Sequence, residues 1–164
     1  MEPLNLTFSK SVGSTRTLPL IQCTFIVYIL KLLTIMPSVF TKIINGDIPS
    51  YKIAETEDFY AFLDINPNAK GHTLCIPKRE VDYVFDLENE EYLGLMQFAK
   101  RTAKAIEAVV PCDRIGIAVV GLEVPHVHIH LIPLTSMEDM KFEKKVTLSE
   151  EEFSDLAQKI SSMF

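Results

Sequence analysis

The most constraining feature of this sequence is a run of three histidines at alternate positions, His126, His128 and His130. The residues between them, Val127 and Ile129, are β-branched, and this alternation is typical of a β-strand. Alternate side chains of a strand share one face. The three imidazoles are therefore expected to project together from a strand whose other face lies in the hydrophobic core.

The chain of 164 residues is long enough for one domain with a proper core, and its composition, 48% hydrophobic and 23% charged, is typical of a globular protein. Its formal net charge of −6 argues against the phosphate backbone of DNA or RNA as a ligand, because such binding needs a basic face. A small phosphorylated ligand is compatible with this charge. The three cysteines form neither a disulfide framework nor a CxxC metal motif, which favours a reducing, cytoplasmic compartment.

Residues 1–35 differ from the rest of the chain. They hold three basic residues and one acidic residue, so residues 36–164 carry a formal charge of −8. Within them, residues 18–30 form an apolar stretch that is shorter than the ~20 residues of a membrane span. A signal peptide or an anchor is one interpretation. We favour a second, in which Met36 is the real start, because well-patterned globular sequence begins directly after it, and we predict one domain over residues 36–164.

Hydrophobic periodicity and turn-forming residues predict the order of the helices and strands. Asp86 is expected to cap a long helix that Pro111 ends. Strands and helices in this order predict an α+β domain, with a mainly antiparallel sheet of about five strands, one long helix and a C-terminal helix. The expected elements are a helical turn at 40–45, strands at 51–54, 59–64 and 72–77, the long helix at 87–110, a central strand at 114–120, a turn at Gly121, the histidine strand, and a helix that opens at Ser149 with a capping-box pattern.

The histidine row has three possible explanations. In the first, the histidines have only a structural role, and in the second they bind a metal ion. Three core or surface histidines that alternate by chance would gain the fold little, because neighbouring imidazoliums repel each other by ~1–4 kcal/mol. Two histidines at positions i and i+2 can share a zinc ion with a third ligand from elsewhere. All three cannot easily do so, since the Cα atoms of His126 and His130 would lie ~13 Å apart along a strand.

The third explanation is nucleophilic catalysis on phosphorus. A neutral imidazole attacks without a separate base, and with a pKa of about 6.5 it is mostly unprotonated at neutral pH. Flanking histidines can hold its tautomer, donate hydrogen bonds to phosphate oxygens and protonate a leaving group. The spacing suits these roles, but by itself it does not say which of the three histidines is the nucleophile.

Residues 126–132 resemble, at every position, the signature His-φ-His-φ-His-φ-φ of the histidine-triad (HIT) family, in which φ is hydrophobic. The similarity extends over nearly all of residues 38–164, with clear blocks at residues 40–49, 59–67 and 71–78. It is greatest to the Hint-like, protein-kinase-C-interacting branch common in bacteria. It implies a HIT-like fold and a hydrolase or transferase acting at the α-phosphate of a purine nucleotide, with a nucleoside 5′-phosphoramidate as the leading substrate class. It also implies a nucleotidyl-histidine intermediate, and a homodimer formed through the long helix and a sheet edge.

The resemblance makes His128 the nucleophile, and His126 and His130 the groups that bind phosphate oxygens or orient it. His72, placed between a glycine turn and an apolar strand, would join them from a neighbouring strand. Asp64 would accept hydrogen bonds from the ribose hydroxyls, because an ionised carboxylate is only an acceptor. An apolar slot for the base would be formed by Phe40, Ile43, Phe62 and Ile65.

The segment before the triad departs from the polar Gly-Gln-Ser-like pattern that is frequent in the family. Gly121 and the backbone amides beside it could still bind phosphate, whereas Leu122 cannot donate as a glutamine could. Glu123 would repel an anionic leaving group and favour an amine. Two alternatives therefore stay open: a dinucleoside polyphosphate hydrolase of the same fold, and a nucleotide-binding regulatory protein with little turnover. The zinc-binding cysteines of some bacterial members are absent near Ser38 and Thr41, so we expect no metal and no cofactor.

Overall fold

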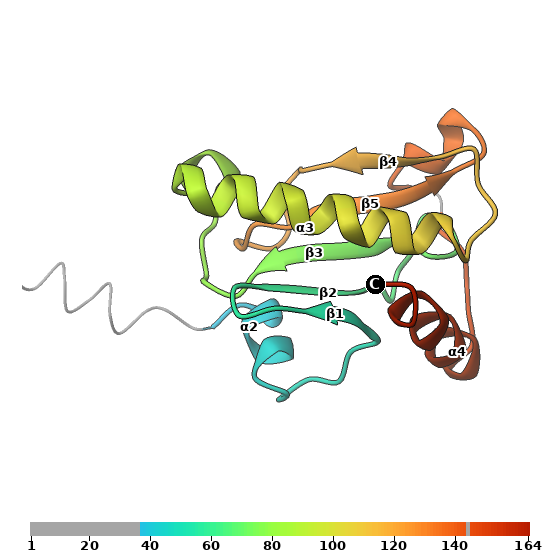
Figure 1. The fold of residues 1–164 in the computed structure, drawn as a ribbon, viewed down its shortest axis with the longest axis horizontal. Coiled ribbons are helices and arrows are strands. Elements are labelled where there is room, and N and C mark those ends of the chain that lie inside the picture. The colour runs from blue at the N-terminus through green and yellow to red at the C-terminus, as the bar shows by residue number, and fades with distance from the viewer. Residues whose placement is uncertain (1–36, 144) are drawn as a thin grey trace, which may run out of the picture. The chain divides into compact units, whose positions relative to one another are not determined.

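A computed structural model describes residues 37–143 and 145–164, and the expected extension over residues 1–35 lies outside the described residues. Within the described part, no helix is both long enough and apolar enough to cross a membrane. Figure 1 shows the long helix α3 lying across the sheet. The elements are α2 (Val39–Ile44), β1 (Lys52–Glu55), β2 (Phe59–Leu63), β3 (Thr73–Pro77), the 3₁₀ helix η1 (Val84–Asp86), α3 (Asn89–Glu107), β4 (Arg114–Ala118), β5 (Ile129–Leu134), the 3₁₀ helix η2 (Met137–Met140) and α4 (Glu150–Ser161).

The five strands form one antiparallel sheet in the order β1-β2-β3-β5-β4, which confirms the predicted α+β class. The central strand is β3, and its register places Leu74 opposite His130 of β5. Strands β3 and β5 are separated in sequence by the whole of α3 and β4. The sheet therefore brings the segment that begins at His72 beside the histidine segment.

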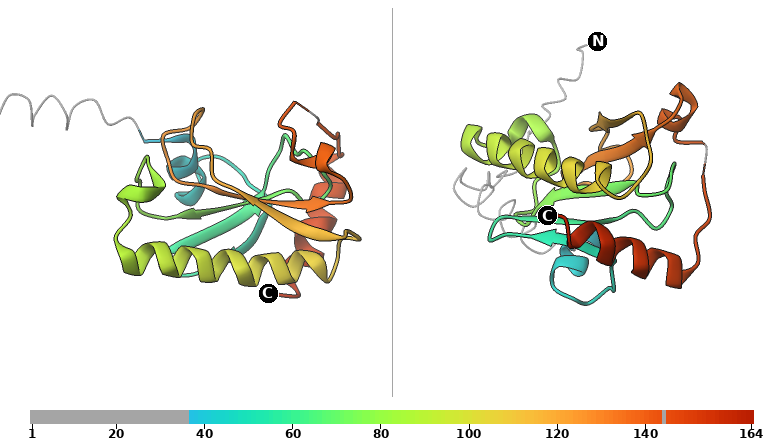
Figure 2. Two further views of the ribbon diagram at one scale, coloured as in Figure 1. Left: turned by 90° about the horizontal axis from the view of Figure 1, so that it is seen from above. Right: turned by 45° about the vertical axis from the view of Figure 1, so that its right-hand side comes forward.

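The two faces of the sheet carry different hydrophobic clusters. The larger cluster contains Val127, Ile129 and Leu131 together with residues of α3 and α4, whereas the smaller one contains Phe40 of α2 and Phe62 of β2. Figure 2 shows α2 on the opposite side of the sheet from α3. The hydrophobic residues of the histidine segment therefore face the main core, as the alternation predicts, and the imidazoles lie on the α2 side.

Three details of the sequence prediction were wrong. The long helix begins at Asn89 with Glu88 as its N-cap, because Val84–Asp86 instead form a 3₁₀ turn and Leu87 is extended and buried. The segment predicted as a central strand, β4, is an edge strand that pairs with β5 alone. Strand β5 begins only at Ile129, because its ladder with β4 ends at His130 and residues 119–128 form an irregular connection.

A prediction concerns Gly71, which precedes His72 and has φ +87°. An alanine Cβ here would lie 2.9 Å from Cγ2 of Val110, so Gly71→Ala should lower the free energy of unfolding by about 2–4 kcal/mol, from backbone strain and overpacking together. The matched control is Gly46→Ala, at φ +81° in open space, which should cost only about 1–2 kcal/mol. Urea unfolding measures both, and equal losses would contradict the predicted packing contribution.

Candidate active site

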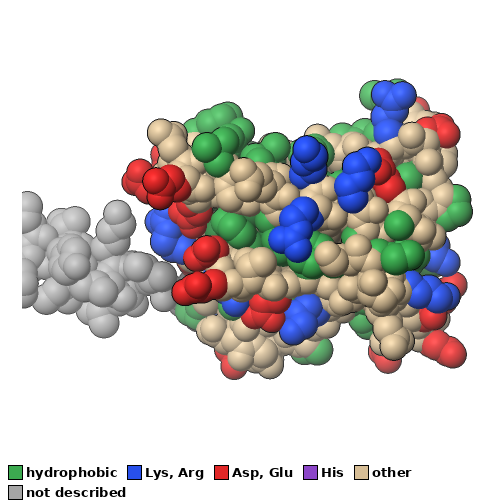
Figure 3. All heavy atoms as spheres, in the orientation of Figure 1, with side chains coloured by type: hydrophobic (Ala, Val, Ile, Leu, Met, Phe, Trp, Pro, Cys, Tyr) green, Lys and Arg blue, Asp and Glu red, His purple; other side chains and the backbone are tan. Residues whose placement is uncertain are grey.

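All four histidines gather on the α2 side of the sheet, and almost all of their surface is buried. His72 and His126 are 0% exposed, whereas His128 and His130 retain 6% and 8% of their surface. No histidine is visible on the face that α3 covers (Figure 3). His128 and His130 are therefore the two rings of the row that keep an edge towards solvent.

The hydrogen bond of His128 identifies its tautomer. Its Nδ1 lies 2.6 Å from the backbone carbonyl oxygen of His126. A carbonyl oxygen only accepts, so Nδ1 carries the proton and donates it. In the neutral ring the lone pair is then on Nε2, which makes no hydrogen bond with any described residue. Nε2 is therefore free to act as a nucleophile. The ring of Phe40 packs edge-on against His128, with centroids 5.2 Å apart.

The ring of His126 is directed away from the rest of the row. Its Nε2 donates to the carbonyl oxygen of Pro77 over 2.8 Å, and its Nδ1 lies 2.8 Å from Oγ of Ser38. Burial lowers the pKa of His126 below 6.5, although the Pro77 carbonyl and the Glu80 carboxylate oppose this shift. Both ring nitrogens are occupied, so His126 can orient His128 through its carbonyl group but has no free nitrogen for a phosphate.

A directed chain of hydrogen bonds reaches His130 from the other side. The backbone N–H of Asn68 donates to Nδ1 of His72 over 3.1 Å, which places the proton of a neutral His72 on Nε2. That nitrogen lies 3.0 Å from Nδ1 of His130 and donates to it. The remaining proton of His130 is therefore on Nε2, where it forms no hydrogen bond with a described residue. It is available as a donor to a ligand oxygen.

The environment keeps this chain neutral. Burial, followed by the nearby ammonium group of Lys145, lowers the pKa of His72 to about 3. Burial also lowers the pKa of His130 to about 3, and the neighbouring His72 and His128 rings act in the same direction. The 3.6 Å contact between Nδ1 of His72 and Oδ2 of Asp64 is consequently not an ion pair at neutral pH, because His72 is uncharged there.

Asp64 and the apolar residues expected to bind a nucleotide lie on the same side of the sheet, with one exception. Oδ1 of Asp64 accepts from the backbone N–H of Asn66 over 2.8 Å, and Oδ2 faces His72. Phe40 and Phe62 belong to the smaller hydrophobic cluster, with Ile43 packed against it. Ile65 does not join that cluster, because it is 74% exposed.

The loop before the histidines does not place its expected phosphate-binding residues against the triad. Gly121 adopts φ +71°, a turn conformation that favours glycine, and Glu123 is exposed to solvent. Leu122 is 89% exposed. The residue of this loop that packs on the α2 side is Val124, which contacts the smaller hydrophobic cluster.

Asp64, His72 and His130 offer one possible metal-ligand atom each, all within 4.8 Å of one another. Both ring nitrogens of His72 are engaged in the chain that begins at Asn68, and Nδ1 of His130 ends that chain. A metal ion would have to displace these hydrogen bonds. The donor geometry therefore favours a neutral relay over a metal centre at this position.

Two residues beside the triad were not predicted from the sequence. Phe142 packs edge-on against His130, with ring centroids 4.9 Å apart. Lys145 donates to the carbonyl oxygen of Asn66 and to Oδ1 of Asn68, each over 2.9 Å. Both lie after η2, and no local sequence pattern connects that segment to residues 66–72. The contacts of Lys145 join residues 77 and 79 positions apart.

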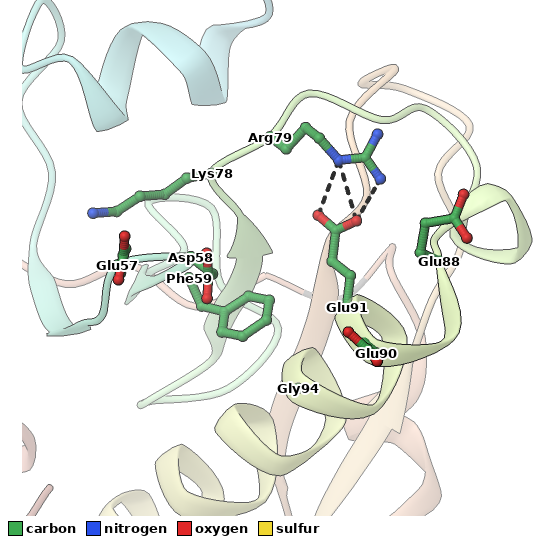
Figure 4. A pocket seen from close by; sticks show the side chains of 9 residues that line it. All are labelled: Glu57, Asp58, Phe59, Lys78, Arg79, Glu88, Glu90, Glu91 and Gly94. Atoms are coloured by element: carbon green, nitrogen blue, oxygen red, sulfur yellow. Dashed lines mark hydrogen bonds and ion pairs between the residues drawn. The ribbon is translucent and has the colours of Figure 1, made fainter.

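A separate cavity of 470 Å³ lies at the end of β3, near the start of α3 (Figure 4). The guanidinium group of Arg79 pairs with the Glu91 carboxylate at its rim. None of the four histidines lines it. The neighbouring Lys78 ammonium group lies 2.8 Å from a carboxylate oxygen of Glu55. The other charged side chains that line the cavity are all carboxylates, which would repel a phosphate group: Glu57, Asp58, Glu88 and Glu90.

Comparison with known proteins agrees with the geometry. The family model of the HIT domain matches residues 45–137. The adenosine 5′-monophosphoramidase HNT1 of Saccharomyces cerevisiae is 43% identical over 100 residues, which are 58% of this chain and 61% of the yeast protein, less than two thirds of its length. A Hit-like protein from Bartonella henselae superposes with a TM-score of 0.68 at 29% identity, covering 77% of this chain and 96% of that one. A Zn-bound histidine triad protein from Mycobacterium smegmatis gives 0.65 at 30% identity, covering 76% and 93%.

Proposed function

The chain belongs to the HIT family, and we propose that it hydrolyses or transfers nucleotides by attack at the α-phosphate of purine nucleotide substrates. The observation that carries this proposal is the hydrogen bond from Nδ1 of His128 to the His126 carbonyl, which leaves the Nε2 lone pair available. The match to a relative described as an adenosine 5′-monophosphoramidase supports an adenosine phosphoramidate as the leading substrate.

The proposed reaction has two displacements. Nε2 of His128 forms a bond to the α-phosphorus while the bond from phosphorus to the leaving amine breaks, which gives a nucleotidyl-histidine. Nε2–H of His130 donates to a phosphate oxygen or to the departing amine, and solvent supplies the proton that the amine needs. Water then attacks phosphorus, the bond to His128 breaks, and the nucleoside monophosphate leaves.

The nucleotide would lie across the α2 side of the sheet. Asp64 would accept from the ribose hydroxyls with Oδ2, the oxygen that lies 3.6 Å from Nδ1 of His72. The base would pack on Phe40 and Phe62, with Ile43 beside them, and the exposed Ile65 would become covered only when a ligand is bound. Gly121 and Glu123 would reach the leaving group only if their exposed loop moved inwards.

The test is a substrate panel on the purified protein. We expect faster turnover of adenosine 5′-phosphoramidate than of diadenosine polyphosphates, together with an adenylyl adduct on His128 in acid-quenched samples analysed by mass spectrometry. Faster cleavage of the dinucleotides would assign the protein to the rival hydrolase class. Tight AMP binding without turnover or adduct would assign it to the regulatory class. Elemental analysis of the same protein, before and after treatment with a chelator, measures its metal content. A stoichiometric metal ion whose removal also abolishes activity would contradict the proposed mechanism.

We further propose a homodimer formed through β4 and α3. Strand β4 is an edge strand with exposed Ile117, and a 420 Å³ apolar hollow beside it is lined by Leu93 and Met96 of α3. An unpaired edge with apolar side chains is a template for pairing with a second copy. Ile117→Lys should therefore convert the dimer to a monomer in sedimentation velocity, whereas Ile65→Lys, at an exposed site away from this edge, should leave it dimeric. A monomeric wild type would contradict the proposal.

We also propose a cytoplasmic location for the domain. Cys75 is buried and Cys112 is partly buried, and both are free thiols. Burial raises the pKa of the Cys75 thiol to about 12, which keeps it protonated and unreactive. Free, inert cysteines of this kind are compatible with a reducing compartment.

A further inference from the structure

A cluster of three polar side chains lies beside the ring of His126, and one of them contacts it directly. Ser38 precedes α2, Thr41 lies in its first turn, and Glu80 follows β3. Oγ of Ser38 lies 2.8 Å from Nδ1 of His126, and the backbone N–H of Ser38 donates to Oε2 of Glu80 over 3.0 Å. The Thr41 hydroxyl also donates to Oε2 of Glu80. Ser38 is only 8% exposed and His126 is buried, whereas Glu80 lies at the solvent-exposed edge of the cluster.

The direction of every proton in this cluster follows from its acceptors. Nε2 of His126 must donate to the Pro77 carbonyl, so in the neutral ring Nδ1 carries a lone pair and accepts. The single hydroxyl proton of Ser38 therefore points to His126. Oγ of Ser38 in turn accepts from the backbone N–H of Thr41 over 3.1 Å, while the Thr41 hydroxyl proton is used on Glu80. Each donor has one acceptor, and the arrangement permits one orientation of the His126 ring.

The Glu80 carboxylate stabilises this arrangement in its ionised form. Burial alone would raise the pKa of Glu80, but the hydrogen bonds from Thr41 and Ser38 outweigh it and lower the pKa below 4.5. An ionised carboxylate accepts strongly from both donors. Glu80 thus fixes Ser38, and Ser38 fixes His126.

We propose that Ser38, supported by Glu80, is a positioning residue that orients the nucleophile through His126. This inference rests on the proposed function, in which His128 attacks phosphorus. The carbonyl oxygen that accepts the Nδ1 proton of His128 belongs to His126, so a tilt of the His126 residue moves the axis along which Nε2 of His128 points. Glu80 thus holds Ser38, Ser38 holds the His126 ring, and the position of that ring sets the position of the carbonyl group that His128 contacts.

The ligand atoms of this cluster can be compared with those that a structural zinc ion needs. Ser38 and Thr41 offer neutral hydroxyl oxygens rather than thiolates, and the one imidazole lone pair already accepts from Ser38. Zinc in structural sites is held by cysteine, histidine and carboxylate ligands in a closed tetrahedron. The residues of this chain do not fit such a site, so the hydrogen-bonded cluster supplies the rigidity that a bound ion would otherwise give to His126.

The experiment compares Ser38→Ala with Ser38→Thr. Ser38→Ala removes the donor to His126 and the side-chain cap of α2. It should lower kcat for adenosine phosphoramidate by ~10–100-fold with KM changed less than about 3-fold, because the orientation of the nucleophile is disturbed more than the contacts of the bound nucleotide. Ser38→Thr keeps the hydroxyl group and the helix cap, and should restore kcat to within about 3-fold of the wild type. The matched control is Ser50→Ala, which removes a similar hydroxyl contact, 3.0 Å from the Tyr60 hydroxyl, away from the histidines; its kcat should be unchanged.

A spectroscopic measurement decides the inference without any substrate. Long-range ¹H–¹⁵N spectra of the wild type should show His126 protonated at Nε2 alone, and Ser38→Ala should shift the ring signals of both His126 and His128. Proton on Nδ1 of His126, or His128 signals unmoved in Ser38→Ala, would overturn the inference. So would a stoichiometric zinc ion whose removal shifts the His126 signals. If the wild type turns over no nucleotide yet these shifts are seen, the proposed function fails and the positioning cluster stands.

Discussion

Replacing His128 with asparagine is expected to lower kcat for adenosine phosphoramidate by roughly 10³-fold or more, because the loss of a covalent nucleophile removes the reaction path itself. The asparagine amide can still donate to the His126 carbonyl in place of Nδ1, so the fold and the neighbouring rings should persist. AMP binding, measured by calorimetry, should change by less than about 3-fold, since no ground-state contact of the nucleotide depends on the attacking nitrogen.

The matched comparison for this result is His130→Asn. It removes the donor that stabilises charge on the phosphate, so kcat should fall by ~10²–10³-fold while an adenylyl adduct on His128 still forms slowly. His128→Asn should form no adduct at all. Equal turnover by the wild type and His128→Asn would end the assignment of the nucleophile, whatever the behaviour of His130→Asn.

Acid should destabilise the protein well above the pH at which ordinary carboxyl groups titrate. The pKa values of His72 and His130 are lowered to about 3, whereas an unfolded histidine titrates near 6.5. Between these values the unfolded chain binds protons that the folded chain does not, so stability is complete above pH 6.5 and is lost as the pH falls towards 3. The two groups together should lower the free energy of unfolding by about 3–4 kcal/mol between pH 7 and pH 5.

Urea unfolding at a series of pH values from 7 to 5 measures this loss, in a range where the carboxyl groups with lowered pKa values stay ionised in both states. His72→Asn removes one of the two groups with the largest pKa shifts. It should reduce the difference between pH 7 and pH 5 by up to half, because His126, whose pKa is also lowered, adds to the loss. A stability that is flat across this range in the wild type would show that the two histidines bind protons in the folded protein as they do in the unfolded chain, contrary to the lowered pKa values and to the directed chain from Asn68.

Local periodicity predicted the parts of the structure that depend on neighbouring residues. The alternation around His128 placed Val127 and Ile129 in the core, and the Ser149 pattern gave the capping box of α4. The order of strands is a non-local property, so an apolar segment such as β4 was taken for a central strand although it lies at the edge.

In the candidate site too, local sequence patterns indicate which residues to consider, whereas the contacts between distant residues follow only from the fold. His72 could be placed beside the triad from its strand, but the donor that fixes its tautomer, the backbone of Asn68, follows only from the folded turn. Ser38 contacts His126, 88 residues away, and Glu80 contacts Ser38, 42 residues away. No periodicity in the sequence reports such distances.

The division of the histidine segment between two faces also constrains how this protein can change over time. Because core and site residues alternate from Val127 into β5, a slip of one residue in the pairing of β5 would turn His130 towards α3 and α4, and Ile129 and Leu131 towards the site. A gradual shift of the histidines along this segment is thus closed to natural selection. New substrates have to be acquired by altering the surrounding loops, while the strand itself is inherited whole.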